Sequence, residues 1–461
     1  MSIIRLPEVV WRTVYGHLFG SPGEHFAFLL ADCMISQGEP VFIVHDARLV
    51  ADEHVRLARH AYEVTIEGYL PAVNAAVAAG QALIEVHNHG GVRPRFSRAD
   101  RRGFAEFAPY ALGSLPGRPY AATVWGEHTI YGECFHPGGD RTPIRRITVV
   151  GDRLRQVVSR DDDEVMLAAT FDRQLPWFTS AGQRALGRLQ VGVVGAGGTG
   201  SQVIQQLAYL GVRYFVLIDH DTVAPSNLNR LVTATPSDIS AKKVRLAHRL
   251  ITRVAPETTV VAIDDMLQSP VALDALKGVD VIFGCVDNDG ARLILNELAL
   301  AYTIPYLDLG VGIDVEAGCV TEAGGRVTVV LPGGPCLCCL GDIDAGEAQF
   351  FLSRPEDQAR QIERGYVRGF DAPAPAVISL NAAVAAAAVN EFAVLVSGVR
   401  PVAPYTELDL LGLGRSVRSQ WLTPRRVERD PDCVQCAITG QGDRAGLERR
   451  YGQNKQHLAW S

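Results

Sequence analysis

Lysine is nearly absent from this chain of 461 residues. It occurs at four positions, none of them before residue 242, so that 40 of the 44 basic residues are arginine. A GC-rich genome is the simplest explanation of that bias. The formal net charge of −7 leaves no excess of basic residues. That excludes a protein that binds nucleic acid or an anionic membrane surface mainly through its charge.

The chain also lacks the long apolar segments of secreted and membrane-spanning proteins. It starts Met-Ser-Ile-Ile-Arg, without a basic segment followed by an apolar run, so we expect no signal peptide. The most apolar stretch, residues 378–396, contains Asn381, Asn390 and Glu391, and a membrane span rarely tolerates so many polar residues. We therefore predict a packed alanine-rich helix there, and a cytoplasmic protein.

The length exceeds one ordinary hydrophobic core, and 47% hydrophobic with 21% charged residues is typical of globular proteins. Two dense regions flank a polar stretch with four consecutive acidic residues at 161–164. We predict a first α/β domain over 1–140, a linker over 141–166, a second domain over 167–440 and a loosely ordered tail over 441–461. In the second domain, apolar segments alternate with helical patterns, which predicts a mostly parallel, Rossmann-like sheet covered on both faces.

A glycine-rich loop, Gly195-Ala-Gly197-Gly198-Thr-Gly200, follows an apolar strand and opens a predicted helix. Glycines allow backbone N–H groups to approach a phosphate at a helix N-terminus. Asp219 ends the next strand, at a place where a carboxylate can bind ribose hydroxyls. This loop by itself is equally typical of a dinucleotide-dependent dehydrogenase and of an enzyme that binds another nucleotide.

The residues that accompany the loop favour the second class. In chain order they are Phe171-Asp-Arg173-Gln, Asp219-His-Asp221, Ser226-Asn227-Leu-Asn229-Arg230, Lys242-Lys243 and Cys285-Val-Asp287-Asn288. Over residues 170–440 this ordered series resembles the ubiquitin-activating-enzyme superfamily, including the ThiF/MoeB-like activators of thiamine and molybdopterin sulfur carriers. The resemblance implies ATP and Mg²⁺ as cofactors, and adenylation of the C-terminal glycine of a partner protein as the reaction.

The resemblance also implies a role for each matching residue. Asp219 would bind the ribose, Asn227, Arg230 and Lys243 the phosphates, and Asp287 the Mg²⁺ ion. Arg173 would reach the triphosphate bound by the other subunit, which predicts a homodimer through the second domain. These charges suit the chemistry, because negative charge concentrates where a carboxylate attacks the α-phosphate. Leu231 departs from the pattern, since the family usually has glutamine after the arginine.

Two Cys-x-x-Cys pairs predict a structural zinc site. Cys336, Cys339, Cys433 and Cys436 supply four thiolates, the usual tetrahedral shell of Zn²⁺, and the family carries such a site in the same order. A redox dithiol is the alternative interpretation. The odd total of nine cysteines argues against a disulfide framework and for a reducing compartment.

The interval between the two pairs contains no cysteine, although relatives that form a thioester with their modifier carry the nucleophile there. We therefore expect a chain that stops at the acyl adenylate or hands it to a thiol of a partner, such as a conjugating enzyme. Cys338 is left as the alternative nucleophile, whereas Cys285 and Cys319 are expected in the core.

The first domain carries a second metal motif. His87 and His89 end a predicted strand and are followed by Ser97 and Asp100. Histidines at i and i+2 point to the same side of a strand, and a carboxylate on the following helix can complete the shell of a zinc ion. A bare His-x-His is more often a chance surface pair. The full spacing over residues 10–135, with Glu24 upstream, resembles the JAMM (JAB, MPN+) metalloprotease family.

Roles in the first domain follow from that resemblance and from zinc chemistry. His87, His89 and Asp100 would hold the metal, Glu24 would accept the proton of the bound water, and Ser97 would donate to the oxyanion. Asn88 stands where serine or threonine is more common. Glu85, on the same strand, is expected to face away from the two histidines.

Together the two motifs predict a bifunctional enzyme of a ubiquitin-like modifier pathway. It would adenylate the C-terminal glycine of the modifier and cleave the amide or isopeptide bond after that glycine. The alternative is activation of a sulfur carrier, with trimming of the carrier by the first domain; a third possibility is an inactive scaffold. An activated glycine also acylates nearby amines, which offers a second explanation for the scarcity of lysine.

Overall fold

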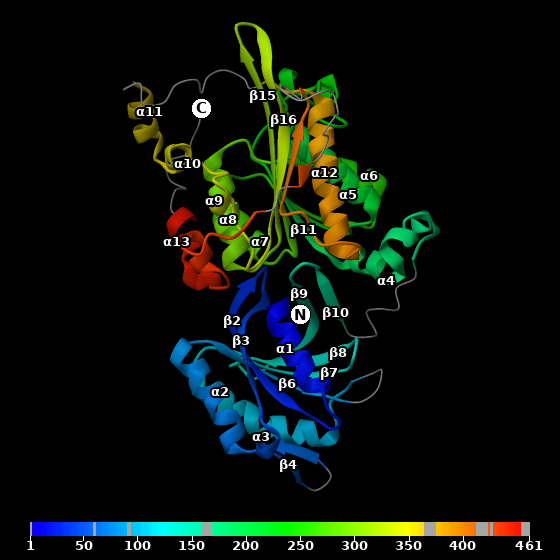
Figure 1. Cartoon of the computed structure of the whole chain (residues 1–461), viewed down its shortest axis with the longest axis vertical. Helices are drawn as coiled ribbons and strands as arrows, with labels where there is room; N and C mark the ends of the chain where they lie inside the picture. The colour runs from blue at the N-terminus through cyan, green and yellow to red at the C-terminus, as the bar shows by residue number, and fades with distance from the viewer. Residues whose placement is uncertain are drawn as a thin grey trace. The chain divides into compact units, whose positions relative to one another are not determined.

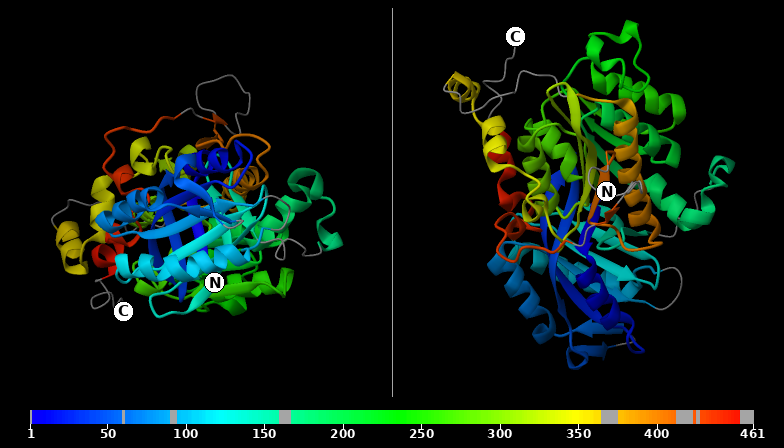
Figure 2. Two further views of the ribbon diagram at one scale, coloured as in Figure 1. Left: turned by 90° about the horizontal axis from the view of Figure 1, so that it is seen from below. Right: turned by 45° about the horizontal axis from the view of Figure 1, so that its top comes forward.

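The computed structural model describes residues 2–58, 61–89, 94–158, 167–363, 375–411, 423–424 and 427–452. The chain divides into two compact units, which are drawn in Figures 1 and 2. The first comprises Met1–Met166 and Gly440–Arg444, and the second comprises Leu167–Thr439 and Ala445–Ser461. Both units mix helices with sheet, so the predicted α/β class is confirmed.

The first unit is built on a sheet that closes on itself. Its elements are β1 (Ser2–Pro7), α1 (Glu8–Phe19), β2 (Phe26–Ser36), β3 (Glu39–Leu49), β4 (Val55–Ala58), β5 (Ala61–Val64), α2 (Ile66–Ala79), β6 (Ala82–Asn88), α3 (Arg98–Ser114), β7 (Tyr120–Trp125), β8 (Ile130–Phe135), β9 (Arg141–Val150) and β10 (Arg155–Val158). The strand order is β1-β3-β2-β6-β7-β8-β9-β10, and β1 also pairs with β9, which closes a barrel. The β4–β5 hairpin forms a separate two-stranded sheet.

Two apolar cores hold this sheet in place. Residues of α1 such as Trp11 share a core with one face, where Trp11 stacks on Trp125 at 4.5 Å between ring centroids. The opposite face packs against α2 and α3, with Phe28 and Phe104 in that core. Strand β6 lies between β2 and β7 and is largely buried on both faces, which fits its central position.

Strands β9 and β10 lie within the stretch 141–166 that the sequence predicts as a linker. Ile147 and Val149 are fully buried in the core of the first unit, and β9 pairs with β1 along its length. Among the described residues, the polar segments at 137–139 and 151–153 form turns and bends between strands of this sheet. Residues 159–166 of the predicted linker lie outside the described residues.

The second unit is built on an eight-stranded sheet. Its elements are α4 (Leu175–Arg188), β11 (Gln190–Val194), α5 (Gly198–Leu210), β12 (Tyr214–Ile218), α6 (Lys243–Val254), β13 (Thr259–Ile263), α7 (Pro270–Lys277), β14 (Val281–Gly284), α8 (Asp289–Ala301), β15 (Tyr306–Glu316), β16 (Cys319–Val330), α9 (Leu337–Leu340), α10 (Ala345–Leu352), α11 (Pro355–Glu363), α12 (Ile378–Ser397), β17 (Tyr405–Asp409), β18 (Thr423–Pro424) and α13 (Leu447–Tyr451). The order is β13-β12-β11-β14-β15-β16-β17-β18, with the first five strands parallel and the last three antiparallel.

Helix α12 is the alanine-rich segment that the sequence predicts as a packed helix. It packs against α5 and against β15 and β16, and Figures 1 and 2 show it alongside α5 and the sheet. Within the part of the chain that the structure describes, it is the one helix long and apolar enough to span a membrane, yet 67% of its most apolar window is buried in the protein. Its small side chains allow this close approach of α12 to its neighbours.

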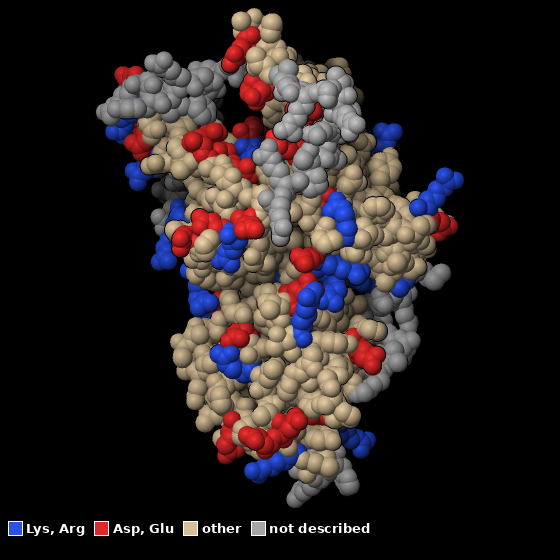
Figure 3. Space-filling model, viewed as in Figure 1, with Lys and Arg blue, Asp and Glu red and all other residues tan. Residues whose placement is uncertain are grey.

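The β15–β16 hairpin extends beyond the strands that flank it. Acidic residues Asp314, Glu316 and Glu322 are exposed near its tip, where red side chains gather in Figure 3. Cys319 begins β16 at this tip and is exposed, so the prediction that it lies in the core is wrong. The turn at Gly318, with φ of 81°, joins β15 to β16, and Cys319 pairs there with Glu316 at the exposed end of the hairpin.

The stretch 441–461, predicted as a loosely ordered tail, contains helix α13. Leu447 and Tyr451 are buried, and both the Tyr451 hydroxyl and the Arg450 guanidinium donate to the carboxylate of Glu297 on α8. This pairing satisfies a buried carboxylate, which explains why a charged segment is ordered here. Residues 453–461 of the predicted tail lie outside the described residues.

Candidate nucleotide and metal sites

The predicted nucleotide-binding residues meet at the carboxyl ends of three neighbouring parallel strands. Gly195 directly follows β11, Asp219 directly follows β12, and Asp287 is the third residue after β14. The chain runs from β11 to β12 and β13 on one side and then returns to β14 on the other. Such a reversal of strand order opens a crevice in which α/β proteins bind their ligands.

The glycine-rich loop is shaped for close backbone approach. Gly195 has φ of 89°, and a Cβ atom there would lie 2.3 Å from the carbonyl oxygen of Cys285. A Cβ at Gly200 would lie 1.9 Å from the carbonyl oxygen of Gly195. Gly197 lies directly before α5, and a Cβ atom there would meet no other atom within 4 Å. The loop therefore leaves room for a ligand at the N-terminus of α5, where backbone N–H groups favour a phosphate.

Two aspartates and one lysine line the same edge. Asp219 is buried, and its carboxylate accepts hydrogen bonds from the backbone N–H groups of Ala196 at 2.7 Å and Asp221 at 2.8 Å. Burial raises the pKa of the Asp219 carboxyl. Lys243 pairs with Asp221 at 2.6 Å, and although burial opposes the shift, this ammonium lowers the pKa of Asp221. The ion pair fixes a cation beside the loop.

Of the remaining residues predicted to contact the nucleotide, one lies over the glycine loop, one bonds to its own segment, and two are exposed. Arg230 lies over the glycine loop, since a Cβ at Gly198 would be 3.0 Å from its Cδ. The Asn227 side chain accepts a hydrogen bond from the backbone N–H of Ala224 at 3.1 Å, and the Asp287 carboxylate is exposed. Arg173 is exposed ahead of α4 and has no hydrogen bond to the other predicted residues of this site in the described chain.

Leu231 has a structural explanation. It is 5% exposed and packs with Val223 and Leu246 in a small apolar cluster beneath the Arg230 segment. An apolar residue at this position therefore stabilises the segment that carries Arg230.

Asn381, which none of the sequence motifs includes, also lies beside this loop. It lies in the first turn of α12, and a Cβ at Gly198 would lie 2.4 Å from its Nδ2 atom. The alanine-rich pattern around Asn381 indicates only a core helix. The one sign in the sequence that Asn381 has another role is that it is polar within an apolar run.

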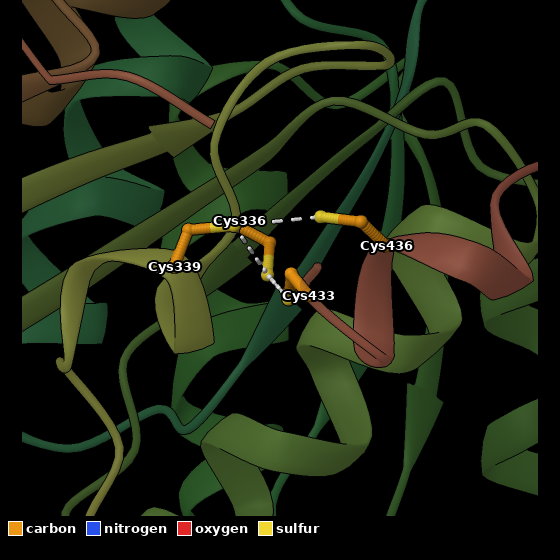
Figure 4. Close-up of side chains that lie close together, drawn as sticks. All are labelled: Cys336, Cys339, Cys433 and Cys436. Carbon is orange, nitrogen blue, oxygen red and sulfur yellow. Dashed lines mark hydrogen bonds between the residues drawn. The ribbon is translucent and has the colours of Figure 1, made fainter. Parts of the chain in front are cut away.

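The four cysteines predicted to bind zinc form one cluster (Figure 4). Their sulfur atoms lie 3.7 Å apart for Cys336–Cys339, 3.7 Å for Cys336–Cys433 and 3.5 Å for Cys339–Cys436. Sulfurs at the corners of a tetrahedron around Zn²⁺ are about 3.8 Å apart, given Zn–S bonds of about 2.3 Å. The cluster therefore fits a zinc ion. Cys338 is not among its members.

The first unit brings its predicted metal ligands together as well. The ligand atoms of His87, His89 and Asp100 all lie within 4.8 Å of one another, and the Asp100 carboxylate is 3.7 Å and 3.5 Å from the two Nε2 atoms. Ligands around a tetrahedral zinc ion are about 3.4 Å apart for bonds of about 2.1 Å. Glu24 approaches from the loop before β2, 3.6 Å from Nε2 of His89.

His87 gives an independent sign that this cluster suits a cation. It is 1% exposed, and neither of its ring nitrogens has a hydrogen-bond partner among the described residues. Unpartnered buried nitrogens are uncommon in proteins, and a metal ion would satisfy one of them. Burial opposes the shift, yet His87 and Ser97 lower the pKa of the Asp100 carboxyl, which keeps it anionic.

Ser97 and Asp100 are positioned by the start of α3. Ser97 is the N-cap residue: its Oγ accepts from the backbone N–H of Asp100 at 3.1 Å, and the Asp100 carboxylate accepts from the Ser97 N–H at 2.6 Å. This capping box fixes the carboxylate close to the histidines. The Ser97 hydroxyl proton is left available for donation, because the hydroxyl acts as acceptor in this pair.

The prediction that Glu85 faces away from the histidines is wrong. Residues i and i+2 of a strand share a face, so Glu85 and His87 point to the same side of β6. The Tyr120 hydroxyl donates to the Glu85 carboxylate at 2.6 Å, and burial raises the pKa of Glu85. The His87 ring partly offsets that shift, consistent with its position nearby.

Comparison with known proteins identifies the second unit. Residues 171–433, more than half of the chain, match the ThiF family. The chain belongs to the ThiF family. The matched range lies within the second unit. It contains the glycine-rich loop and three of the four clustered cysteines, Cys336, Cys339 and Cys433.

Three relatives illustrate the range of this ThiF-family similarity. The SAMP-activating enzyme E1 of Haloferax volcanii is 31% identical over 159 residues, 34% of this chain and 56% of that protein. The adenylyltransferase and sulfurtransferase MOCS3 of Mus musculus is 29% identical over 297 residues, 64% of this chain and 57% of the relative. The molybdopterin-synthase adenylyltransferase of Escherichia coli is 31% identical over 180 residues, 39% of this chain and 69% of the relative. The match thus spans only a little over half of the first two proteins.

Proposed function

We propose that this ThiF-family chain uses ATP and Mg²⁺ to adenylate the C-terminal carboxylate of a small glycine-ended protein. The observation that carries the proposal is the pairing of Lys243 with Asp221 beside the open glycine loop, next to the backbone-bonded carboxylate of Asp219. Arg230 adds a second cation over the same loop. One cation over the N-terminus of α5 and a second close to Asp219 suit a polyphosphate.

The proposed reaction is a displacement at the α-phosphate. The partner's carboxylate oxygen forms a bond to the α-phosphorus, the bond to the bridging oxygen breaks, and pyrophosphate leaves. Arg230, Lys243 and the N–H groups that open α5 would stabilise the charge on the phosphate oxygens. A bound Mg²⁺ supplies further positive charge, and Asp287 offers an exposed oxygen ligand of the kind that Mg²⁺ prefers.

The relatives favour a sulfur carrier over a conjugated modifier as the partner. Two of the three are named as adenylyltransferases, of molybdopterin synthase in Escherichia coli and together with a sulfurtransferase activity in Mus musculus. The Haloferax volcanii relative is named as an E1 that activates SAMP. We therefore prefer activation of a sulfur carrier to the ubiquitin-like modifier pathway that the sequence first indicates.

Pyrophosphate exchange tests this function. The full chain, labelled pyrophosphate and ATP are incubated with purified sulfur-carrier or ubiquitin-like proteins that end in glycine, and with the same proteins lacking that glycine. Exchange should require the glycine, and Asp287→Ala should lower it by about a hundredfold to a thousandfold. Asp314→Ala, an exposed aspartate on the β15–β16 hairpin, is the matched control. Exchange that is unchanged in Asp287→Ala contradicts the proposal.

We propose a second function for the first unit, namely zinc-dependent hydrolysis of the bond after the partner's terminal glycine. Support comes from the convergence of His87, His89 and Asp100 and from the unpartnered ring nitrogens of His87. A zinc ion bound there lowers the pKa of a water ligand toward 7 and so supplies a nucleophile. Glu24, 3.6 Å from Nε2 of His89, would take the proton of that water and return it to the leaving amine.

Two variants separate metal binding from turnover in the first unit. Glu24→Gln should keep the zinc and lose hydrolysis of a carrier or modifier joined through its glycine to a reporter amine, because Glu24 acts on a proton and is not a ligand. Glu53→Gln, which alters an exposed glutamate elsewhere in the first unit, should change neither property. The proposed role is contradicted if Glu24→Gln loses its zinc, or if this variant keeps full turnover.

Two further properties belong to the same proposal. Arg173 is exposed and free of hydrogen bonds to the described nucleotide site, which supports its predicted role in the site of a second subunit and hence a homodimer. The reduced, zinc-compatible state of the four clustered cysteines supports a reducing compartment such as the cytoplasm.

A further inference from the structure

Asn381 lies beside the glycine loop at the N-terminus of α5, although neither the glycine-loop motif nor the ordered series of residues that accompanies it includes this asparagine. It occupies the first turn of α12 and is 4% exposed. Its Nδ2 atom would be 2.4 Å from a Cβ on Gly198, and the Cδ of Arg230 would be 3.0 Å from the same point. Gly198 is the first residue of α5. Asn381 and Arg230 therefore flank the N-terminus of that helix together.

The side-chain amide of Asn381 has no hydrogen-bond partner among the described residues. The backbone N–H of the residue donates to Val377 at 3.1 Å, as the start of α12 requires, but this leaves the side chain unused. Neither polar atom of the amide is completely sealed from solvent, since both are missing from the fully buried unpaired atoms. The amide is therefore nearly buried but still reachable by a ligand, and it has a hydrogen-bond donor free to pair with one.

The surroundings select an anionic oxygen as that partner. The first N–H groups of α5 are positive, Arg230 is cationic, and Gly197 leaves the space before the helix open. The amide NH₂ group of asparagine is a hydrogen-bond donor. Building on the proposed use of ATP, we propose that Asn381 donates a hydrogen bond to a phosphate oxygen of the nucleotide bound at the N-terminus of α5.

The position of Asn381 in the chain gives this contact a further consequence. Helix α12 also packs against β15 and β16, so a phosphate that bonds to Asn381 joins the glycine loop to a helix from the other end of the domain. Arg230 and Asn381 then bind the phosphate from two different segments. The contact thereby makes nucleotide affinity depend on α12, which the glycine-loop motif alone does not predict.

Calorimetric titration of the full chain with MgATP, and separately with adenosine, tests the contact. Asn381→Ala should weaken MgATP binding by about tenfold to a hundredfold, the effect of one hydrogen bond to a charged group, and leave adenosine binding unchanged. Asn381→Asp, similar in shape but with an anion in place of the donor, should weaken MgATP at least as strongly. Asn390→Ala, an exposed asparagine on the same helix, is the matched control and should bind MgATP normally.

The outcomes separate this contact from the proposed function. If the unaltered chain fails to bind MgATP, the proposed function fails with it. If the unaltered chain binds MgATP and Asn381→Asp binds it equally well, the contact is wrong and the function stands. Equal loss of MgATP and adenosine in Asn381→Ala would also overturn the contact, because it would mean that Asn381 only supports the fold. Should Asn381→Ala fail to fold, Asn381→Asp decides by the same comparison.

Discussion

The side chain of Asn88 accepts a hydrogen bond from the backbone N–H of His25 at 2.7 Å, and its Nδ2 donates to the carbonyl oxygen of Gly23 at 3.0 Å. It therefore binds the chain on both sides of Glu24. Asn88 itself lies between His87 and His89 on β6 and is 6% exposed. One side chain thus connects the proposed proton acceptor to the end of β6, where His87 and His89 stand on either side of Asn88.

We predict that Asn88→Ala lowers hydrolysis by the first unit by about tenfold or more without loss of zinc. The reason is that catalysis by a proton acceptor depends steeply on its distance from the reacting water. The measurement combines zinc content with the separate determination of kcat and KM, and kcat should carry the change. Asn74→Ala, an exposed asparagine on α2, is the control. An unchanged kcat would show that the Gly23–His25 loop holds Glu24 without Asn88.

We predict about two zinc ions in each chain after purification, one from each cluster. Cys436→Ser should remove one ion and lower the melting temperature by several degrees, because a structural zinc site stabilises the fold. His87→Ala should remove the other ion. Elemental analysis of both variants against Cys319→Ser, which alters an exposed cysteine outside the cluster, checks the assignment. One zinc ion in the unaltered chain would eliminate one of the two sites.

We predict that Asp238 contributes to loss of stability in acid. Its carboxylate pairs with both terminal nitrogens of Arg249, at 2.7 Å and 2.9 Å, and these bonds hold its pKa well below the usual value. A carboxyl with a depressed folded-state pKa stabilises the protein above the unfolded value of about 4, and this contribution is lost as the pH falls. In Asp238→Asn, the urea midpoint should therefore fall less steeply between pH 5 and pH 2. Asp140→Asn, at an exposed turn, should keep the parent slope.

We predict that added lysine near the nucleotide site increases self-modification. Arg245 is exposed two residues after Lys243, whereas Arg253 is exposed at the other end of α6, about 12 Å further along the helix axis. Arg245→Lys, incubated with ATP and a glycine-ended partner, should acquire an acyl adduct more often than Arg253→Lys, because proximity raises the effective concentration of the amine. Mass spectrometry of the two variants and the parent measures this. Equal adduct levels in all three would make genome composition a sufficient cause of the scarce lysine.

The sequence predicts the second unit well because its signals are local and ordered along the chain. The glycine loop, the aspartate after β12 and the Cys-x-x-Cys pairs each depend on short spacings. Family membership follows from that series. The individual roles of Asp219, Asn227, Arg230, Lys243 and Asp287 stay predictions, as do those of the residues in the first unit.

What the sequence does not predict depends on contacts between distant segments. Asn381 lies next to Gly198 only because α12 packs against α5, and nothing in the local pattern indicates that pairing. The strand over Arg141–Val150 falls in the predicted linker. Its partner strand β1 lies more than a hundred residues away in the sequence, so no local pattern indicates that the two pair and close the sheet. Glu85 was a plain error of strand geometry, since positions two apart share a face.

The cysteine cluster has a topological consequence. Cys336 and Cys433 are separated by 97 residues, so a zinc ion held by both pairs would turn the intervening chain into a closed loop. Closing a loop of about 100 residues restricts the unfolded chain, and for a disulfide this is worth about 4.7 kcal/mol in the chain-entropy estimate. After a backbone cut inside this loop, the zinc ion would still join the two fragments, so that in denaturant a chelator would be needed to separate them.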